Sequence, residues 1–197
     1  MISNLNSNPI EEVSNVKRAI AAIQQLQAKI ERLERNLHEP IAIIGMGCRF
    51  PGGVSDPETL WQLLEKGGDP ITDIPSDRWD SQTYYDSNQA SPGKMYVRQG
   101  GFLSNLQDFD AQFFRIAPRE AMSLDPQQRL LLEVSWEALE SSGIAPENLN
   151  SSQTGVFIGI CGNDNWHRLL KRDNTEIDAY LTTGNTHSIA AGRLSYS

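Results

Sequence analysis

Two cysteines and three histidines are the residues of this sequence best suited to nucleophilic or acid–base chemistry. A thiol reacts as its thiolate, which forms at neutral pH only when a base or a helix N-terminus lowers the thiol pKa. Cys48 precedes Arg49 but has no histidine nearby in sequence, and Cys161 follows an apolar run typical of a buried strand. His167 lies six residues after Cys161, and nothing in the sequence brings the two side chains together. We therefore interpret both cysteines as structural thiols.

Other residue patterns that suggest a bound group are incomplete. Two cysteines make neither a disulfide framework nor a zinc site. Gly45-x-Gly47 after an apolar run resembles the start of a dinucleotide-binding loop, but Phe50 occupies the third glycine position. Pro51 and two glycines then follow in place of the helix that would hold a pyrophosphate. The sequence predicts no metal site, no dinucleotide site and no catalytic residue.

A short basic group follows the second cysteine. Arg168, Lys171 and Arg172 would share one face if this stretch were helical. Such a face could contact an acidic carrier protein, although a solvated charged surface is the simpler interpretation.

The formal net charge of −8 lies entirely beyond residue 39, because residues 1–39 carry five basic and five acidic groups. An acidic globular part without a basic stripe argues against nucleic acid and anionic membranes as partners. The first eight residues lack the basic and apolar regions of a signal peptide, and no apolar run is long enough to cross a bilayer. We expect a soluble, cytoplasmic protein.

The first element that the sequence predicts is a helix over residues 9–37. Its apolar residues recur every three or four positions, in a heptad-like seam with one extra three-residue step at Ile23 that is typical of a stammer. The seam consists of Val13, Val16, Ile20, Ile23, Leu26, Ile30, Leu33 and Leu37.

This seam needs a partner, because a single helix of this length is only marginally stable in water. With Ile30 at heptad position a and Leu33 at d, Lys29 falls at g and Glu34 at e, where a parallel partner helix could pair them. The alternative is that the helix packs on its own domain. We favour self-pairing, since the apolar stripe is narrow and longer than in a typical globular helix. Pro40 then ends the helix.

The remaining sequence has the pattern of a layered α/β fold. Residues 41–45 and 155–160 are apolar runs typical of buried strands. A helix is predicted to begin at Asp56 and to end at Gly67 and Gly68, with a buried face that includes Trp61 and Leu64. Further along the chain, the spacing of Phe109, Phe113 and Phe114 is that of a helix face. The strongest helix prediction is 125–142, with Asp125 as N-cap, Gln128 in a capping-box-like position and Gly143 at the end. A last helix is expected over 185–196.

Ordered sequence blocks run from residue 39 onward, and together they resemble the β-ketoacyl synthase (ketosynthase) domains of modular type I polyketide synthases. The blocks are EPIAIIGMGCRFPGG (39–53), DPETLWQLL (56–64), DRWD (77–80), GGFL (100–103), FDAQFF (109–114), APREAMSLDPQQRLLLEVSWEALESSGI (117–144), TGVFIG (154–159) and AGRLSYS (191–197). The preceding helix resembles the N-terminal docking segments of such synthases. The resemblance therefore implies a docking helix over 1–38 and the N-terminal portion of a ketosynthase domain over 39–197.

The resemblance implies a thiolase-like fold, of which this chain carries an incomplete first half. It also implies a decarboxylative Claisen condensation. In the family, a cysteine takes an acyl chain from the phosphopantetheine arm of an acyl carrier protein, and two histidines assist decarboxylation of the malonyl-type extender unit. The family's cysteine lies in a DTACSSS-type block that follows the match to AGRLSYS, and that block is not in this sequence. We therefore expect this chain alone to be inactive in condensation.

The resemblance further implies a homodimer that receives acyl carrier proteins, and an upstream polyketide synthase subunit bound through the N-terminal helix. Asn185 and Ser188 lie in the segment that leads toward the family's nucleophile. By resemblance, these two residues are expected at the acyl pocket or the subunit interface.

Overall fold

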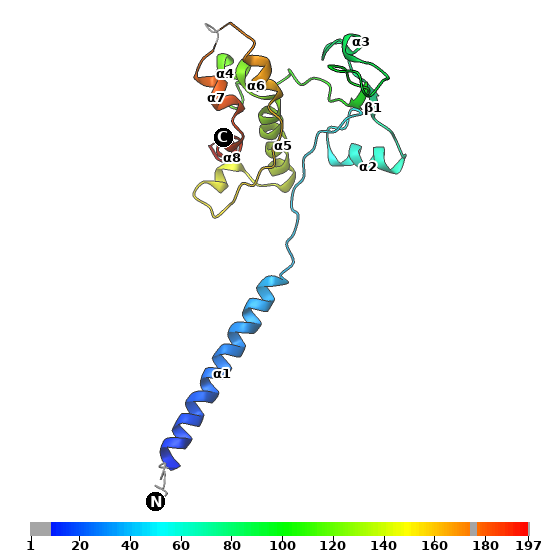
Figure 1. Cartoon of the computed structure of the whole chain (residues 1–197). Helices are drawn as coiled ribbons and strands as arrows, with labels where there is room; N and C mark the ends of the chain where they lie inside the picture. Colours follow the sequence, from blue (N-terminus) through cyan, green and yellow to red (C-terminus); the bar gives the residue numbers. More distant parts are fainter. Residues whose placement is uncertain (1–8, 174–176, 197) are drawn as a thin grey trace, which may run out of the picture. The chain divides into compact units, whose positions relative to one another are not determined.

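The computed structural model describes residues 9–173 and 177–196, and the chain divides into two units that meet between Ile43 and Ile44 (Figure 1). The described part of the first unit is one long helix, α1 (Pro9–Leu37), followed by an extended tail. The helix predicted for residues 9–37 is therefore confirmed. Every seam residue from Val13 onward is exposed, from 50% at Ile20 to 80% at Leu37.

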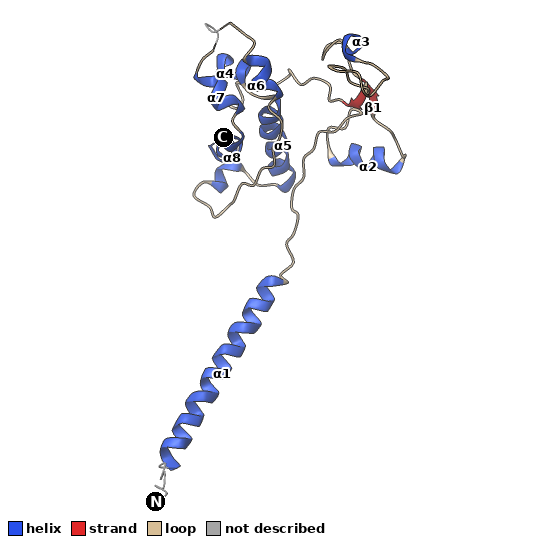
Figure 2. Ribbon diagram, viewed as in Figure 1, coloured by secondary structure: helices blue, strands red, loops and turns tan. Residues whose placement is uncertain are grey.

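The second unit is mainly helical, with one small sheet (Figure 2). β1 (Ile71–Asp73) and β2 (Gln99–Gly101) pair antiparallel, with Ile71 opposite Gly101. The helices of this unit are α2 (Pro57–Glu65), α3 (Ser81–Tyr84), α4 (Pro118–Ser123), α5 (Pro126–Ser142), the 3-10 helix η1 (Pro146–Leu149), α6 (Asp164–Leu169), α7 (Ala179–Asn185) and α8 (His187–Tyr196).

Local capping fixes the ends of α2 and confirms the prediction there. The Asp56 carboxylate accepts a hydrogen bond from the Thr59 backbone N–H at 2.8 Å, and the Thr59 hydroxyl oxygen accepts one from the Asp56 N–H. Together they form a capping box, which satisfies two amide groups that the helix itself leaves unpaired. The helix ends at Glu65, and Gly67, just beyond the C-cap Lys66, has a φ of +61° in the left-handed region that favours glycine.

The ends of α5 are also as predicted, but Gln128 does not take part in its N-terminal cap. The Asp125 side chain accepts from the Gln127 N–H at 2.8 Å, and Gly143 ends the helix with a φ of +70°. The capping-box role expected for Gln128 is wrong. This side chain is almost fully buried and donates to the Thr186 carbonyl oxygen instead, because it faces α8 rather than the cap.

The two segments predicted as buried strands, 41–45 and 155–160, are extended but pair with no other strand in the described residues. Ile41 is 94% exposed and Phe157 93% exposed. The prediction of two strands is thus wrong for this structure. An apolar extended segment becomes a strand only when another segment supplies hydrogen-bond partners, and none in the described part of the chain does so.

The main core of the second unit lies around α4 and α5. Ile116, Leu124 and Leu132 are buried together, and Phe109 and Phe114 pack against them. Residues 111–115 form turns rather than the helix that the phenylalanine spacing suggests. The Phe109 and Phe114 rings pack against the core, whereas Phe113 is 50% exposed.

The apolar face of α2 departs from its expected burial. Trp61 is 60% exposed and Leu64 63% exposed. No described residue packs over this face closely enough to bury it, so the predicted buried face is wrong here. The helix itself forms because its capping is local.

None of the described helices has the length and apolar character that a bilayer crossing requires.

Candidate functional site

Cys48 lies in a segment held tightly against α5. A Cβ at Gly47 would come within 2.6 Å of the Val134 carbonyl oxygen, so only glycine fits there, and Gly45 approaches the Ala138 carbonyl oxygen even more closely. Burial raises the pKa of the Cys48 thiol, Asp56 raises it further, and Arg49 only partly opposes these effects. A thiol with a raised pKa is a weak nucleophile at neutral pH, which agrees with a structural role.

Cys161 is exposed, and the histidine near its turn is not the one closest in sequence. The Nε2 atom of His187 lies 2.9 Å from the carbonyl oxygen of Gly162, the residue after Cys161. His167 is exposed on α6. Sequence reasoning considered His167 because it is closer in the chain, and it missed His187 because only the packing of α8 brings that ring to the turn.

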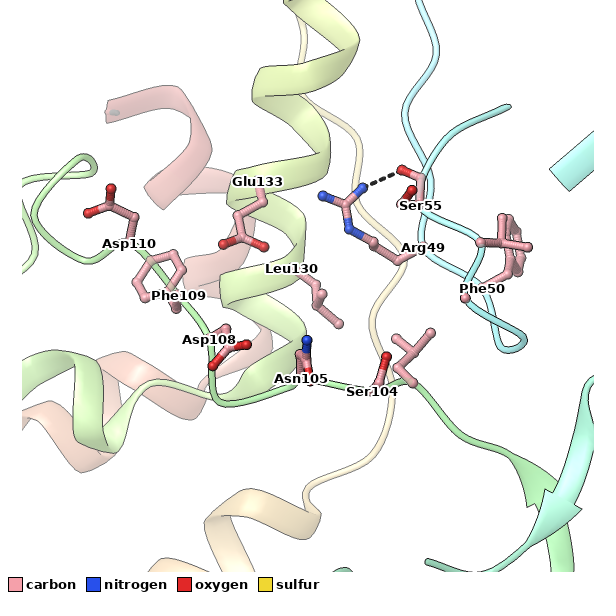
Figure 3. Close-up of a pocket in the computed structure, with 13 residues that line it drawn as sticks. Arg49, Phe50, Ser55, Ser104, Asn105, Asp108, Phe109, Asp110, Leu130 and Glu133 are labelled. Carbon is pink, nitrogen blue, oxygen red and sulfur yellow. Dashed lines mark hydrogen bonds between the residues drawn. The ribbon is translucent and has the colours of Figure 1, made fainter. Parts of the chain in front are cut away.

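A cleft of about 400 Å³ lies in the second unit, between the loops that follow Cys48 and β2 and one side of α5 (Figure 3). Its walls combine apolar side chains with carboxylates. The lining residues are Arg49, Phe50, Gly53, Val54, Ser55, Leu103, Ser104, Asn105, Asp108, Phe109, Asp110, Leu130 and Glu133. No cysteine or histidine is among them, so the cleft has no thiol nucleophile, and its two serines, Ser55 and Ser104, have no histidine in the lining to activate them.

The charge of this cleft is organised by Arg49. Its guanidinium donates to the Glu137 carboxylate, at 2.7 Å for one oxygen. It also donates to the Ser55 carbonyl oxygen at 2.6 Å (Figure 3). The hydrogen bond to Glu137 raises the pKa of Arg49. Burial raises the pKa of Glu133, and Arg49 partly opposes that rise. The arginine thus joins the loop after Cys48 to α5 and leaves Glu133 as a partly buried carboxylate at the wall.

The two residues expected at a pocket or subunit interface have different surroundings. Asn185 is 4% exposed. Its amide donates to the carbonyl oxygens of Ser123 (2.9 Å) and Leu181 (2.8 Å), and its side-chain oxygen accepts from Asn165 at 2.7 Å. Ser188 is exposed near the start of α8. The structure therefore places Asn185 in a buried polar cluster without Ser188, and their role at a pocket or interface stays a prediction.

A second buried polar group, which sequence reasoning missed, connects α4, α5 and α8. The Arg193 guanidinium donates to Glu120 at 2.7 Å and to the side-chain oxygen of Gln128 at 3.2 Å. The available signal for this contact was a glutamine three and four residues before Leu131 and Leu132, on the same face of the helix. Its partner 65 positions away was not visible from the sequence.

Comparison with known proteins identifies the class that these features belong to. The family model for the N-terminal domain of β-ketoacyl synthase matches residues 38–197. The chain is 47% identical over 184 residues to one subunit of the phenolphthiocerol/phthiocerol polyketide synthase of Mycobacterium tuberculosis, covering 92% of this chain and 8% of that protein. This chain belongs to the β-ketoacyl synthase family. It spans less than a tenth of the length of that curated relative.

Solved structures agree on the fold. An oxazolomycin ketosynthase domain from Streptomyces albus matches with a TM-score of 0.68 and 33% identity, over 78% of this chain and 27% of that one. The ketosynthase of module 6 of the bacillaene synthase from Bacillus subtilis matches with a TM-score of 0.66 and 35% identity, over 79% and 24%. The thiolase-like ketosynthase fold and the polyketide synthase resemblance that the sequence blocks predicted are confirmed.

Proposed function

We propose that this chain is the N-terminal portion of a polyketide synthase ketosynthase whose full-length form catalyses decarboxylative Claisen condensation of carrier-protein-bound acyl and malonyl-type units. The observation that carries the proposal is the family match, which extends over residues 38–197. The fold shared with solved ketosynthase domains supports it. Its carrier-protein partners would present the substrates on phosphopantetheine arms, in the cytoplasm.

The described residues of this chain act as scaffold in this proposal. Condensation requires a thiolate that accepts the acyl chain and groups that stabilise negative charge on an enolate oxygen. Cys48 is a poor candidate because burial raises its thiol pKa, and the cleft beside it holds carboxylates, which disfavour a developing anion. The chain alone is therefore expected to be inactive.

A thioester assay tests this expectation. The purified chain is incubated with an acyl thioester and a malonyl-loaded carrier protein, and both the protein mass and the β-ketoacyl product are followed by mass spectrometry. We expect no turnover, whereas the polypeptide encoded by the whole reading frame should form the product. Turnover by the chain alone that disappears in the Cys48→Ser or the Cys161→Ser variant would overturn the structural assignment of the thiol that was replaced.

We also propose a second function, in which α1 pairs with a second copy of itself and docks an upstream synthase subunit. Its eight seam residues remain 50–80% exposed along one helix. In a parallel pair, Lys29 at position g would face Glu34 at position e of the other helix, five residues further along. This charge match favours a second copy of α1, packed parallel to the first, as the partner of the seam.

The test is the helicity of a peptide of residues 1–39, measured by circular dichroism across a range of concentrations. Helicity that rises with concentration is expected, because an isolated helix of this length is marginal without a partner. A signal that stays constant while sedimentation reports a monomer would contradict self-pairing.

A further inference from the structure

Two arginine side chains converge on the junction between α4 and α5. The Nε and Nη2 atoms of Arg129 both donate to the Leu124 carbonyl oxygen, at 3.0 and 2.8 Å. Arg168 donates from Nη2 to the side-chain oxygen of Asn165 at 2.7 Å, and the Asn165 amide lies 3.5 Å from the neighbouring Ser123 carbonyl oxygen. Arg129 therefore contacts one of two consecutive carbonyl groups directly, and Arg168 reaches the other through Asn165.

Within the described residues, no ion pair neutralises the positive charge at this junction. Arg49, Arg119 and Arg193 each pair with a carboxylate, but no ion pair joins Arg129 or Arg168 to any described residue. Burial lowers the pKa of Arg129 and the charge of Arg168 lowers it further, while Asp125 partly opposes them. A half-buried cation beside a second cation is a costly arrangement unless an anion offsets it.

The carboxylate of Asp125, which acts on the Arg129 pKa, is already hydrogen-bonded. The Asp125 carboxylate accepts from the backbone N–H of Gln127 at 2.8 Å and from its side-chain amide at 3.3 Å, as the N-cap of α5. Lys171 and Arg172 come shortly after α6 and add positive charge close to Arg168 in the chain. The junction is thus a local concentration of cations on an acidic protein.

We propose that Arg129 and Arg168 form a binding site for a phosphate group. The two contacts of Arg129 with Leu124 use Nε and Nη2 and leave Nη1 with no hydrogen bond to a described residue. The hydrogen bond that Arg168 donates to a described residue uses Nη2 alone. Guanidinium forks match the oxygen spacing of a tetrahedral phosphate and form charge-assisted hydrogen bonds with it. This site is separate from the cleft at Arg49 and does not depend on condensing activity.

The experiment is a titration of the full chain with inorganic phosphate at constant ionic strength, adjusted with sodium chloride. The thermal unfolding midpoint and the ³¹P line width are both recorded. We expect a saturable rise of the midpoint, since a ligand that binds only the folded state stabilises it, and chloride alone should not reproduce it. Sulfate, another tetrahedral oxyanion, should compete with phosphate.

Variants distinguish this site from general screening. Arg168→Gln removes an exposed charge and should raise the apparent dissociation constant for phosphate roughly tenfold or more, the loss expected for a charge-assisted hydrogen bond. Arg129→Lys keeps the charge but loses the fork, and should also weaken binding. Arg18→Gln removes one exposed charge from α1 and should leave the dissociation constant unchanged. Circular dichroism spectra verify that each variant is folded.

Parent-like phosphate binding by Arg168→Gln would overturn the proposal, as would an equal midpoint rise in chloride. Phosphopantetheine and pantetheine, titrated in parallel, identify the source of the phosphate. Tighter binding of phosphopantetheine than of inorganic phosphate assigns the site to a carrier arm, and equal binding assigns it to free phosphate. Both results support the site, even if the condensation assay of the full-length enzyme fails.

Discussion

Replacement of Ile30 by alanine is the sharpest test of the α1 seam. Ile30 lies at heptad position a and is 53% exposed on the single helix. If the seam pairs with a second copy, this side chain faces its equivalent across the interface. The substitution therefore removes apolar contact from both helices of a dimer at once, while alanine keeps the helix itself stable.

The size of the effect follows from the exposed fraction. Full burial of an isoleucine side chain stabilises by roughly 1.5–3 kcal/mol relative to full exposure. Because about half of the Ile30 side chain is already covered within its own helix, pairing contributes about 1 kcal/mol per copy. Ile30→Ala should then weaken a dimer by about 2 kcal/mol, which corresponds to a roughly 30-fold higher dissociation constant.

The assay is sedimentation equilibrium of the full chain, parent and variant, at several concentrations. Gln25→Ala is the matched control, since position c of the same heptad register faces solvent in a paired helix and the change has a small effect on helix propensity. An unchanged dissociation constant for Ile30→Ala would refute the seam as the pairing surface. Equal weakening by Gln25→Ala would do the same.

Three further predictions concern the second unit. Gly45→Ala should cost about 1–3 kcal/mol of stability, because a Cβ there meets the Ala138 carbonyl oxygen, and thermal unfolding measures the loss. Glu120→Gln should cost about 2 kcal/mol in denaturant unfolding, since the Arg193 side chain is only 15% exposed and would lose its carboxylate. Asp56→Asn should flatten the acid limb of the stability profile measured by denaturant unfolding. Hydrogen bonding from Thr59 lowers the pKa of Asp56 in the folded protein below its value in the unfolded chain, so this stabilisation is complete above the unfolded pKa and is lost as pH falls through the folded pKa.

Each of these substitutions has a control in the same unit. Gly159→Ala places a Cβ where no atom lies within 4 Å, so it should be nearly neutral. Asp77→Asn removes an exposed ion pair and should change stability by less than about 1 kcal/mol. Asp69→Asn removes an exposed carboxylate outside any helix cap and tests whether the acid limb is specific to Asp56. If a control variant changed stability as much as the substitution it accompanies, the contact proposed to explain that substitution would be contradicted.

The seam of α1 and the ends of α2 and α5 could be predicted from the sequence, because their determinants are local. Asp56 and Asp125 cap with their own side chains, and Gly143 adopts a left-handed conformation one residue past its helix. Burial was harder to predict. Trp61 and Phe157 belong to apolar patterns, but a pattern shows only that a face can be buried, and the covering surface must come from elsewhere.

The amino-acid sequence by itself determined the family, through ordered blocks from Glu39 onward, and the periodicity of the first helix, because both depend on residues close together in the chain. Only the tertiary structure decided which distant side chains meet. Asn185 joins Asn165, and Arg168 comes to the junction that Arg129 caps, because α5, α6 and α7 pack around the same turn. Those contacts span 20 to 42 residues, and no local pattern encodes the packing that creates them.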